Sequence, residues 1–201
     1  MKPILIDLPI PITTTRLLLR PPKPGDGMEL NQAILDSWDA LHAEMPWADQ
    51  KPSIESSEEN VRRAYAQWIL REDLRISIYD RITNELIGST GFHRIDWDLP
   101  AMEIGYWLKT SHVCKGLATE STGALTTYAF KVLSAKRVEI RCDADNRKSA
   151  AVAERLGFQL EARLKKNTTK ANGMLRDTLI YVRHDLNGLP DFRVGWPETH
   201  S

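Results

Sequence analysis

Hydrophobic and polar positions alternate most regularly in KRVEIRC, residues 136–142. Val138, Ile140 and Cys142 fall on one face of an extended chain, and the charged residues between them fall on the other. Strict alternation of this kind is typical of a strand with one face in the core and the other towards solvent. We therefore expect a half-buried strand here.

A second period, close to that of an α-helix, runs through residues 53–73. Val61, Tyr65, Trp68 and Ile69 come together on one helical face, and mostly polar residues occupy the rest. This segment is expected to be an amphipathic helix that packs through that face.

The same patterns continue along the rest of the chain, where Gly, Pro and Asn mark the ends of elements. They predict a strand at 15–22, a helix at 25–45, strands at 75–80, 86–95 and 101–109, a helix at 118–133, a short helix at 146–157 with Asn146 as its N-cap, a strand at 158–164 followed by a loop, and a strand at 176–183. In the strand at 101–109, alternation puts Met102, Ile104, Tyr106 and Leu108 on the face towards the core. Two early helices, an antiparallel meander and a strand–helix–strand–helix–strand series indicate an α+β fold with one βαβ-like crossing.

Length and composition limit the classes of protein to which the chain can belong. With 201 residues, 42% of them hydrophobic, we expect one domain over residues 1–186 and a partly ordered tail over 187–201. The 27 basic residues balance 27 acidic ones, which argues against a general nucleic-acid binder. Two cysteines make no disulfide framework, and no apolar stretch approaches the roughly 20 residues of a membrane span, so we expect a cytoplasmic protein. The five histidines lack metal-ligand spacing, so no metal is expected.

The phrase CKGLATES, residues 114–121, combines a glycine-containing turn with the start of a helix. The first turn of a helix has free N–H groups and a positive dipole end, which together bind phosphates. Gly116 has no side chain to block approach and Ala118 has only a methyl group, while Lys115 adds charge and Thr119 a hydroxyl. The phrase alone favours an ordinary strand–helix turn that contains a glycine, and the phosphate site depends on the rest of the chain. Cys114 has no base motif beside it and is expected to be a small buried residue.

Several stretches in their order resemble the GNAT superfamily of N-acetyltransferases. Residues 113–118 match the pyrophosphate-loop pattern [QR]-x-x-G-x-[GA], except that Val113 replaces Gln or Arg. EIGYWL (103–108) resembles the family's fourth strand, and NRKSAAVAERLGF (146–158) its N-x-x-S…LGF element. RDTLIYVR (176–183) resembles its closing strand, and TTTRLLLRPPKPGD, near the N-terminus, the opening strand of the RimJ/RimL-type ribosomal-protein N-terminal acetyltransferases.

The resemblance implies a fold and a cofactor. The fold is a GNAT-like mixed, mostly antiparallel twisted sheet flanked by helices, with a splayed fourth and fifth strand pair. The cofactor is acetyl-CoA, which leaves as coenzyme A. The residues expected to bind it are Trp107, Leu108, Val113, Cys114, Lys115, Gly116, Leu117, Ala118, Thr119, Asn146 and Ser149.

The resemblance also implies candidate catalytic residues. Glu103 lies where many members place a strand carboxylate beside the thioester, although it could equally be a solvent-facing strand residue. Ser149 resembles the serine that acts as general acid in the RimL-type branch, although it could simply bond the backbone of its helix. Two departures weaken a direct copy: Ala153 stands near the place of the family's usual tyrosine, and KKNTTK (165–170) has no carboxylate.

Trp47, His93 and Trp97 lie in or near loops that should flank the acceptor, and we expect them in the acceptor site. The alternatives are a surface or hydrogen-bonded structural role for His93, which is commoner than a catalytic one, and tryptophans that only cap the core. The resemblance predicts transfer of an acetyl group to a primary amine, most simply the N-terminal α-amine of a protein such as a ribosomal protein. Acetylation of a small amine (an amino acid, polyamine or antibiotic) and a non-catalytic acyl-CoA-binding module stay open. The sequence is compatible with a monomer or a homodimer.

Overall fold

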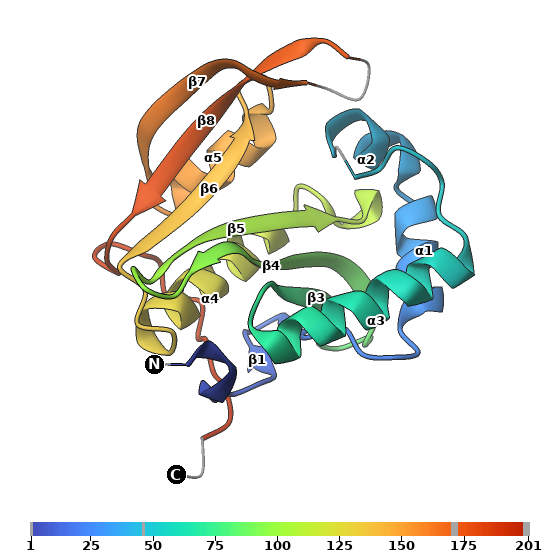
Figure 1. Ribbon diagram of the computed structural model, residues 1–201, viewed down its shortest axis with the longest axis horizontal. Helices are drawn as coiled ribbons and strands as arrows, with labels where there is room; N and C mark the ends of the chain where they lie inside the picture. The colour runs from blue at the N-terminus through green and yellow to red at the C-terminus, as the bar shows by residue number, and fades with distance from the viewer. Residues whose placement is uncertain (1, 46, 170–172, 199–201) are drawn as a thin grey trace.

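The computed structural model describes residues 2–45, 47–169 and 173–198, and its strands form one eight-stranded sheet in the order β1-β2-β3-β4-β5-β6-β8-β7 (Figure 1). The strands are β1 (Ile12–Thr13), β2 (Leu17–Arg20), β3 (Leu74–Asp80), β4 (Leu86–Asp96), β5 (Ala101–Leu108), β6 (Arg137–Asp143), β7 (Gln159–Thr169) and β8 (Leu175–Arg183). The helices are α1 (Gly27–Leu35), α2 (Trp38–Glu44), α3 (Ile54–Leu70), α4 (Leu117–Lys131) and α5 (Arg147–Arg155), with short 3-10 turns at Pro3–Leu5 and Thr110–His112.

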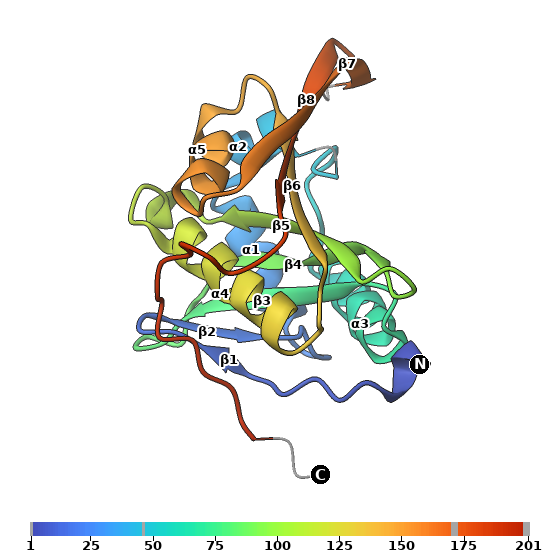
Figure 2. The ribbon, with the colours of Figure 1, turned by 90° about the vertical axis from the view of Figure 1, so that its left-hand side faces the viewer.

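Helices cover both faces of this sheet. Helix α3, with α1 beside it, lies over one face, and α4 lies behind the opposite face (Figures 1 and 2). Every strand pairing is antiparallel except that of β5 with β6, which α4 connects as the expected βαβ crossing. The predicted α+β, GNAT-like architecture is confirmed. None of the helices in the described part of the chain is long and apolar enough to cross a membrane.

The β5–β6 pair is splayed, as expected for the family's fourth and fifth strands. Only three residues of β5, Ala101–Glu103, pair with β6, opposite Arg137–Glu139. Beyond Glu103, β5 continues beside β4 to Leu108, while β6 continues beside β8. The two strands thus part at Glu103, and beyond it β5 pairs with no strand on the β6 side within the described part of the chain.

The predicted half-buried strand is confirmed in β6. Val138, Ile140 and Cys142 are buried, whereas Arg137, Glu139 and Arg141 are only partly so. By contrast, the segment predicted as one helix at 25–45 contains two helices that meet near Ser37. The hydroxyl of Ser37 accepts a hydrogen bond from the backbone N–H of Thr110, a tertiary contact that a local pattern cannot reveal.

The buried face of α3 differs from the prediction. Val61, Ala64 and Trp68 are buried, but Tyr65 is 40% exposed and Ile69 is 46% exposed. The helix therefore buries a narrow stripe at positions i, i+3 and i+7. Including Tyr65 and Ile69 on the buried face was wrong, because the helix turns that side outward.

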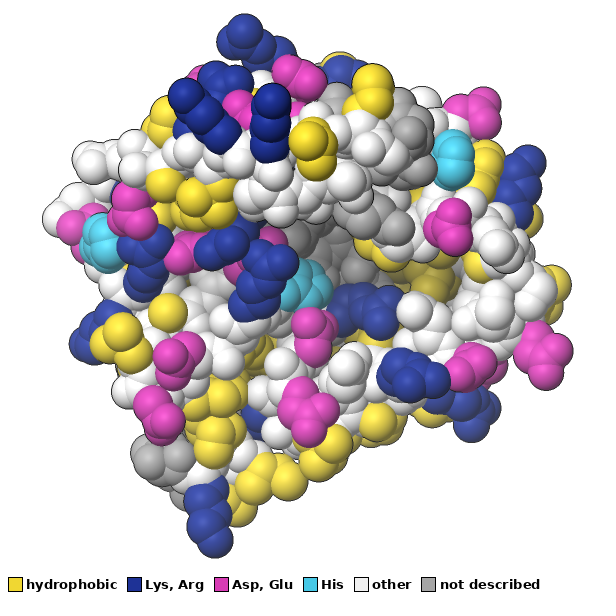
Figure 3. Space-filling view, turned by 45° about the horizontal axis from the view of Figure 1, so that its top comes forward, with side chains coloured by type: hydrophobic (Ala, Val, Ile, Leu, Met, Phe, Trp, Pro, Cys, Tyr) yellow, Lys and Arg dark blue, Asp and Glu magenta, His cyan; other side chains and the backbone are white. Residues whose placement is uncertain are grey.

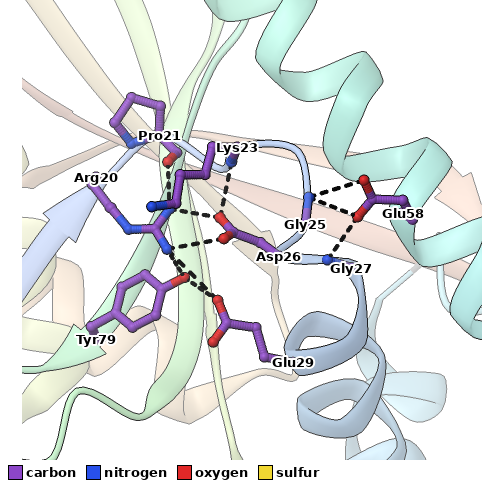
Figure 4. Close-up of polar contacts among 9 residues, drawn as sticks. All are labelled: Arg20, Pro21, Lys23, Gly25, Asp26, Gly27, Glu29, Glu58 and Tyr79. Atoms are coloured by element: carbon purple, nitrogen blue, oxygen red, sulfur yellow. Dashed lines mark hydrogen bonds and ion pairs between the residues drawn. The ribbon is translucent and has the colours of Figure 1, made fainter.

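A polar network fixes the connection from β2 to α1 (Figure 4). The guanidinium of Arg20 donates to both carboxylate oxygens of Asp26, and its Nη2 also donates to the hydroxyl of Tyr79 on β3. Asp26 in turn accepts from the backbone N–H of Lys23. The Tyr79 hydroxyl donates to Glu29 in the first turn of α1, so one cluster ties helix and sheet together.

Helix α3 holds the beginning of α1 from the other side. The Glu58 carboxylate accepts hydrogen bonds from the backbone N–H groups of Gly25 and Gly27 (Figure 4). A Cβ on Gly27 would come within 2.5 Å of the Glu58 Cα, so only glycine permits this close approach. The result is a fixed α1–α3 pair, which supports one wall of the site described below.

The C-terminal segment lies against the body of the protein. The backbones of Thr13 and Gly195 exchange two hydrogen bonds, and the ring of Trp196 meets Tyr128 edge-on at 5.4 Å between centroids. Phe192 occupies the space beside Gly123 of α4. The division into a domain and a tail stays a prediction, but the expected partial order does not describe residues 187–198, which pack on the core.

The β7 strand is longer than predicted. It runs through Lys165 to Thr169, where a loop was expected after Leu164. Register shifts between Leu160 and Ala162 and between Leu164 and Thr168 let the strand bend as it continues. Lys170 lies outside the described residues.

Candidate active site

The loop before α4 has the backbone shape of an anion cradle. Gly116 is the N-cap of α4 and has a left-handed φ of 77°, with only an Arg16 nitrogen within 4 Å of where a Cβ would lie. Cys114 is also left-handed, with a φ of 60°, and it is exposed. The expectation that Cys114 is buried was wrong, because the loop turns outward here before the helix begins.

An ion pair from the other end of the chain braces this loop. The buried carboxylate of Glu120, in the first turn of α4, accepts from the Thr14 hydroxyl at 2.6 Å and from Arg16 Nε at 2.6 Å. Arg16 Nη1 donates to the Lys115 carbonyl at 2.9 Å. Sequence reasoning missed Arg16 and Glu120, since no local pattern links residues so far apart.

The remaining loop residues suit a phosphate ligand. Leu117 and Ala118 pack against the core and anchor the helix start, while Lys115 is exposed and Thr119 half-buried. The first N–H groups of α4 have no partner within the helix, and they point out of its positive end. Val113, which replaces the family's Gln or Arg, is 37% exposed.

The two faces of β5 carry different groups. Met102 and Ile104 are buried against α4, as predicted from the alternation. Tyr106 follows on the same face, and Trp107 on the opposite face packs against apolar side chains of α1 and α2. Between them lies Gly105, in the segment where β5 has left β6.

Two adjoining cavities, each of about 630 Å³, meet at this segment. The first lies between β3–β5 and the helices α1 and α3, and the second follows the opening between β5 and β6 as far as α5 and β7–β8. Both are lined by Met45, Trp47, His93, Gly105 and Tyr106. Figure 3 shows the hollowed face, with acidic and basic side chains around the hollow.

Glu103 lines the second cavity at the point where the strands part, held by two arginines. Its Oε2 accepts from Arg94 Nη1 at 2.8 Å and lies 3.5 Å from Arg141 Nε. Arg141 also bonds Glu139, which Arg137 holds from its other side. Burial alone would raise the pKa of Glu139, but hydrogen bonds from these two arginines outweigh it and hold that pKa below its usual value.

Ser149 and Asn146 lie on the other side of the opening. The hydroxyl of Ser149 lies 2.9 Å from that of Tyr106, which also donates to the Ser149 carbonyl. Asn146 accepts from the Ser149 N–H at 2.9 Å and donates to Glu44 of α2 at 2.9 Å, linking α5 to α2. Asn146 is thus the N-cap of α5, as predicted.

Tyr106 is a candidate that sequence reasoning missed. Alternation alone had assigned it to the apolar face of its strand, and its contact with Ser149 joins residues 43 positions apart. Burial raises the pKa of Tyr106, so its hydroxyl stays protonated near neutrality. The structure therefore adds a tyrosine hydroxyl that does not come from the helix before LGF.

The predicted acceptor residues do not all come together. Trp47 and His93 line both cavities, and the Trp47 ring lies 6.1 Å from that of Trp107. Trp97 lines neither cavity; its indole N–H donates to the Arg71 carbonyl, and its ring packs against the core. Leu108, at the end of β5, pairs with Gly88.

Among the described residues, no group of three or more His, Cys, Asp or Glu side chains is placed to hold a metal ion. The donors and acceptors that line the two cavities are carboxylates, arginines, an imidazole, amides and hydroxyls.

Comparisons with known proteins agree with this architecture. The family model described as an acetyltransferase (GNAT) domain matches residues 16–159. The "Putative ribosomal N-acetyltransferase YdaF" of Bacillus subtilis is 33% identical over 172 residues, which cover 84% of this chain and 88% of that protein. The ribosomal-protein-serine acetyltransferase of Escherichia coli is 37% identical over 100 residues, only 50% of this chain and 55% of that protein.

Among solved structures, one neighbour is RimL, a ribosomal L7/L12 α-N-protein acetyltransferase in complex with coenzyme A. It has a TM-score of 0.80 and 28% sequence identity, and the match covers 86% of this chain and 96% of that one. The opening between β5 and β6 and the cradle at Gly116 thus occur in a fold that has been seen with coenzyme A bound.

Proposed function

The chain belongs to the GNAT acetyltransferase family, and on that premise we propose that it transfers the acetyl group of acetyl-CoA to the α-amino group at the N-terminus of a protein. Acetyl-CoA is the cosubstrate of the family. The α-amine as acceptor is supported by relatives named as ribosomal-protein acetyltransferases.

The observation that carries the proposal is the pair of adjoining cavities beside β5. Together they offer room beyond a single amino group and its immediate substituent, because each has the volume of a site for a drug-sized ligand. Trp47 and the neighbouring Trp107 provide an apolar wall on which the first side chains of an extended peptide can pack.

The proposal gives each substrate its own direction of approach to β5. The pyrophosphate cradle at Gly116 begins α4, on the face of the sheet opposite α3, so the cosubstrate would approach from the α4 side. The first cavity lies on the α1–α3 side, where the acceptor would enter. The two would meet beside Gly105, where β5 has left β6, and backbone groups of β5 that face the opening would hold the thioester.

An α-amine also needs little help from the protein to lose its proton. Its pKa is about 7.7–8.0 against about 10.4 for a lysine side chain, so a useful fraction is already neutral near pH 7. On the leaving-group side, the Ser149 hydroxyl is placed to give a proton to the departing thiolate, and Tyr106 is placed to return one. Ser149 would then act as the general acid.

The test is an acceptor screen with a defined comparison. Purified protein and acetyl-CoA are mixed with peptides that begin with different residues, with the same peptides carrying a blocked N-terminus and a free lysine, and with small amines. The proposal predicts release of coenzyme A and a mass gain only with a free α-amine on a peptide. Turnover of small amines alone would reject the protein acceptor, and binding of acetyl-CoA without turnover of any amine would favour a non-catalytic module.

A further inference from the structure

The imidazole of His93 stands at the junction of the two cavities and lines both. His93 forms the last regular pair of β4 with β5, opposite Glu103, just before the register of β4 shifts. A Cβ on Gly105 would lie 3.1 Å from His93 Nε2. Glycine at this position therefore leaves space between the ring and the strand that borders the opening.

A carboxylate holds the other nitrogen of this ring. His93 Nδ1 lies 2.6 Å from Oδ2 of Asp73, in the segment that leads into β3. An ionised carboxylate only accepts hydrogen bonds, so Nδ1 carries the hydrogen and Nε2 keeps its lone pair in the neutral ring. The His93 and Asp73 side chains are 34% and 27% exposed, so the pair is open to the cavities instead of being sealed in the core.

We propose that His93 is the general base of the acetyl transfer and that Asp73 positions it. Nε2 takes a proton from the acceptor's ammonium group, and the neutral amine attacks the thioester carbonyl. The C–N bond forms, the C–S bond breaks, and the thiolate takes its proton from the hydroxyl side of β5. The attacking nitrogen gives its second proton to solvent water, and water returns a proton to the hydroxyl. The proposal rests on the acetyltransferase activity of the family, whichever primary amine is the acceptor.

The surroundings of Glu103 favour His93 for this role. Oε2 of Glu103 lies against two cationic side chains, Arg94 and Arg141, so this oxygen is already engaged in ion pairs. His93 Nε2, in contrast, faces the space beside Gly105. A base in this position also lies on the face of β5 opposite the Ser149–Tyr106 hydroxyls, so proton removal and proton delivery are separated by the strand itself.

Other titratable or charged groups border the same two cavities. They are Glu44 of α2, Arg75 of β3, Arg94 of β4, Glu103 and Tyr106 of β5, Arg141, Cys142 and Asp143 of β6, and Arg176 of β8, besides Asp73. The α3 side chains at the first cavity, such as Asn60 and Gln67, are neutral. An ionisation in the pH profile of kcat/KM is therefore assigned to His93 only if it is absent from the His93→Gln protein and present in the Glu103→Gln protein.

The first experiment measures kcat/KM for the acceptor against pH, using any primary amine that the wild-type protein acetylates. His93→Gln is expected to lower kcat/KM near pH 7 by about 10²-fold or more, the scale of a general base. Its acidic limb should move towards the pKa of the amine, about 7.7–8.0 for an α-amine. Asp73→Asn should lower kcat/KM by a smaller factor and move the acidic limb in the same direction. Calorimetry should show that both variants bind acetyl-CoA as the wild type does.

The matched control is His184→Gln, which changes an exposed histidine remote from both cavities. Its profile should match that of the wild type. A folded His93→Gln protein whose kcat/KM stays within about twofold of wild type, with an unmoved profile, would overturn the proposal. If peptides fail as acceptors and a small amine reacts, the proposal of a protein acceptor is rejected. The role of His93 is then tested by measuring the same pH profiles with that small amine.

A second measurement does not depend on a variant that folds or on turnover. Nitrogen chemical shifts of the His93 ring in the wild-type protein distinguish the two neutral tautomers. Hydrogen on Nδ1 is expected from the contact with Asp73. Hydrogen on Nε2 would remove the lone pair from the cavity side and would overturn the proposal.

Discussion

The hydroxyl groups of Tyr106 and Ser149 lie 2.9 Å apart, one on β5 and the other in the first turn of α5. Because β5 and β6 have already separated at this level, the contact reaches across the opening between the strands. Each hydroxyl can therefore donate to the other or to a third group placed between them. In the proposed mechanism, these two hydroxyls would pass the proton that the departing thiolate takes up.

Removing the hydroxyl of Ser149 or that of Tyr106 should affect kcat to different extents. Ser149→Ala is expected to lower kcat by about 10²-fold, because the thiolate loses its proton donor. Tyr106→Phe should cause a smaller loss, since Ser149 can still be reached by water. Steady-state kinetics with an acceptor amine checks this; equal, negligible effects on kcat would leave the pair as a structural contact.

The cradle at Gly116 predicts a specific loss of acetyl-CoA binding. Gly116→Glu adds bulk and a negative charge where phosphates would lie and should raise the acetyl-CoA Kd more than about tenfold, or about 1.4 kcal/mol. Gly188→Glu is the control, because Gly188 has a similar φ of 71° and open space around it but lies in the C-terminal segment. Calorimetry with both folded variants gives the comparison, and equal affinities would remove the loop from the cofactor site.

The two loop tryptophans should now behave differently. Trp47→Ala is expected to raise the acceptor KM by about tenfold, or about 1.4 kcal/mol, with little change in the acetyl-CoA KM. Trp97→Ala should leave both KM values near those of the wild type, because Trp97 lines neither cavity. Any loss in that variant should appear in its melting temperature. A selective rise in the acceptor KM for Trp97→Ala would restore it to the site.

The ion pairs of Glu139 predict a pH dependence of stability. Its pKa in the folded protein lies below the ordinary value of 4.5, so the ionised carboxylate stabilises the fold. That contribution is complete above about pH 4.5 and is lost as the pH falls through the lowered pKa. Glu139→Gln should therefore reduce the free energy of unfolding by about 1 kcal/mol near pH 7, allowing for screening by solvent.

Urea titrations at two pH values check this prediction. The wild-type and Glu139→Gln proteins should differ near pH 7 and converge in acid, below the folded pKa of Glu139. Glu161→Gln, which removes the more exposed partner of the same Arg137, should produce a smaller difference. A gap between wild type and Glu139→Gln that is independent of pH would assign the effect to packing.

Much of the fold could be predicted because its signals are local. Alternation in β6 identified both its faces, and Asn146 was recognised as an N-cap from residue type and position. The break at Ser37 could not be predicted, since it depends on a hydrogen bond from Thr110. Tyr65 looked like a core residue because periodicity gives the direction of an apolar face but not its width.

The candidate site likewise contains features with local sequence signals and features without them. The glycine-containing loop and the opening at Glu103 follow from motifs within a few residues, and the roles assigned to them stay predictions. The pairs Arg16–Glu120, Tyr106–Ser149 and Asp73–His93 join distant segments, so only the three-dimensional structure reveals them. A histidine in the sequence says little until the carboxylate beside its ring is known.

The contact between Thr13 and Gly195 has a consequence for folding order. It joins residues separated by 182 positions, almost the full chain, and loop closure over such a distance follows the formation of shorter-range contacts. On the ribosome, β1 and the ring of Tyr128 are made long before Gly195 and Trp196 are synthesised. Until Gly195 and Trp196 have emerged, the nascent chain therefore exposes the edge of β1 and the ring of Tyr128, and these two residues then cover both.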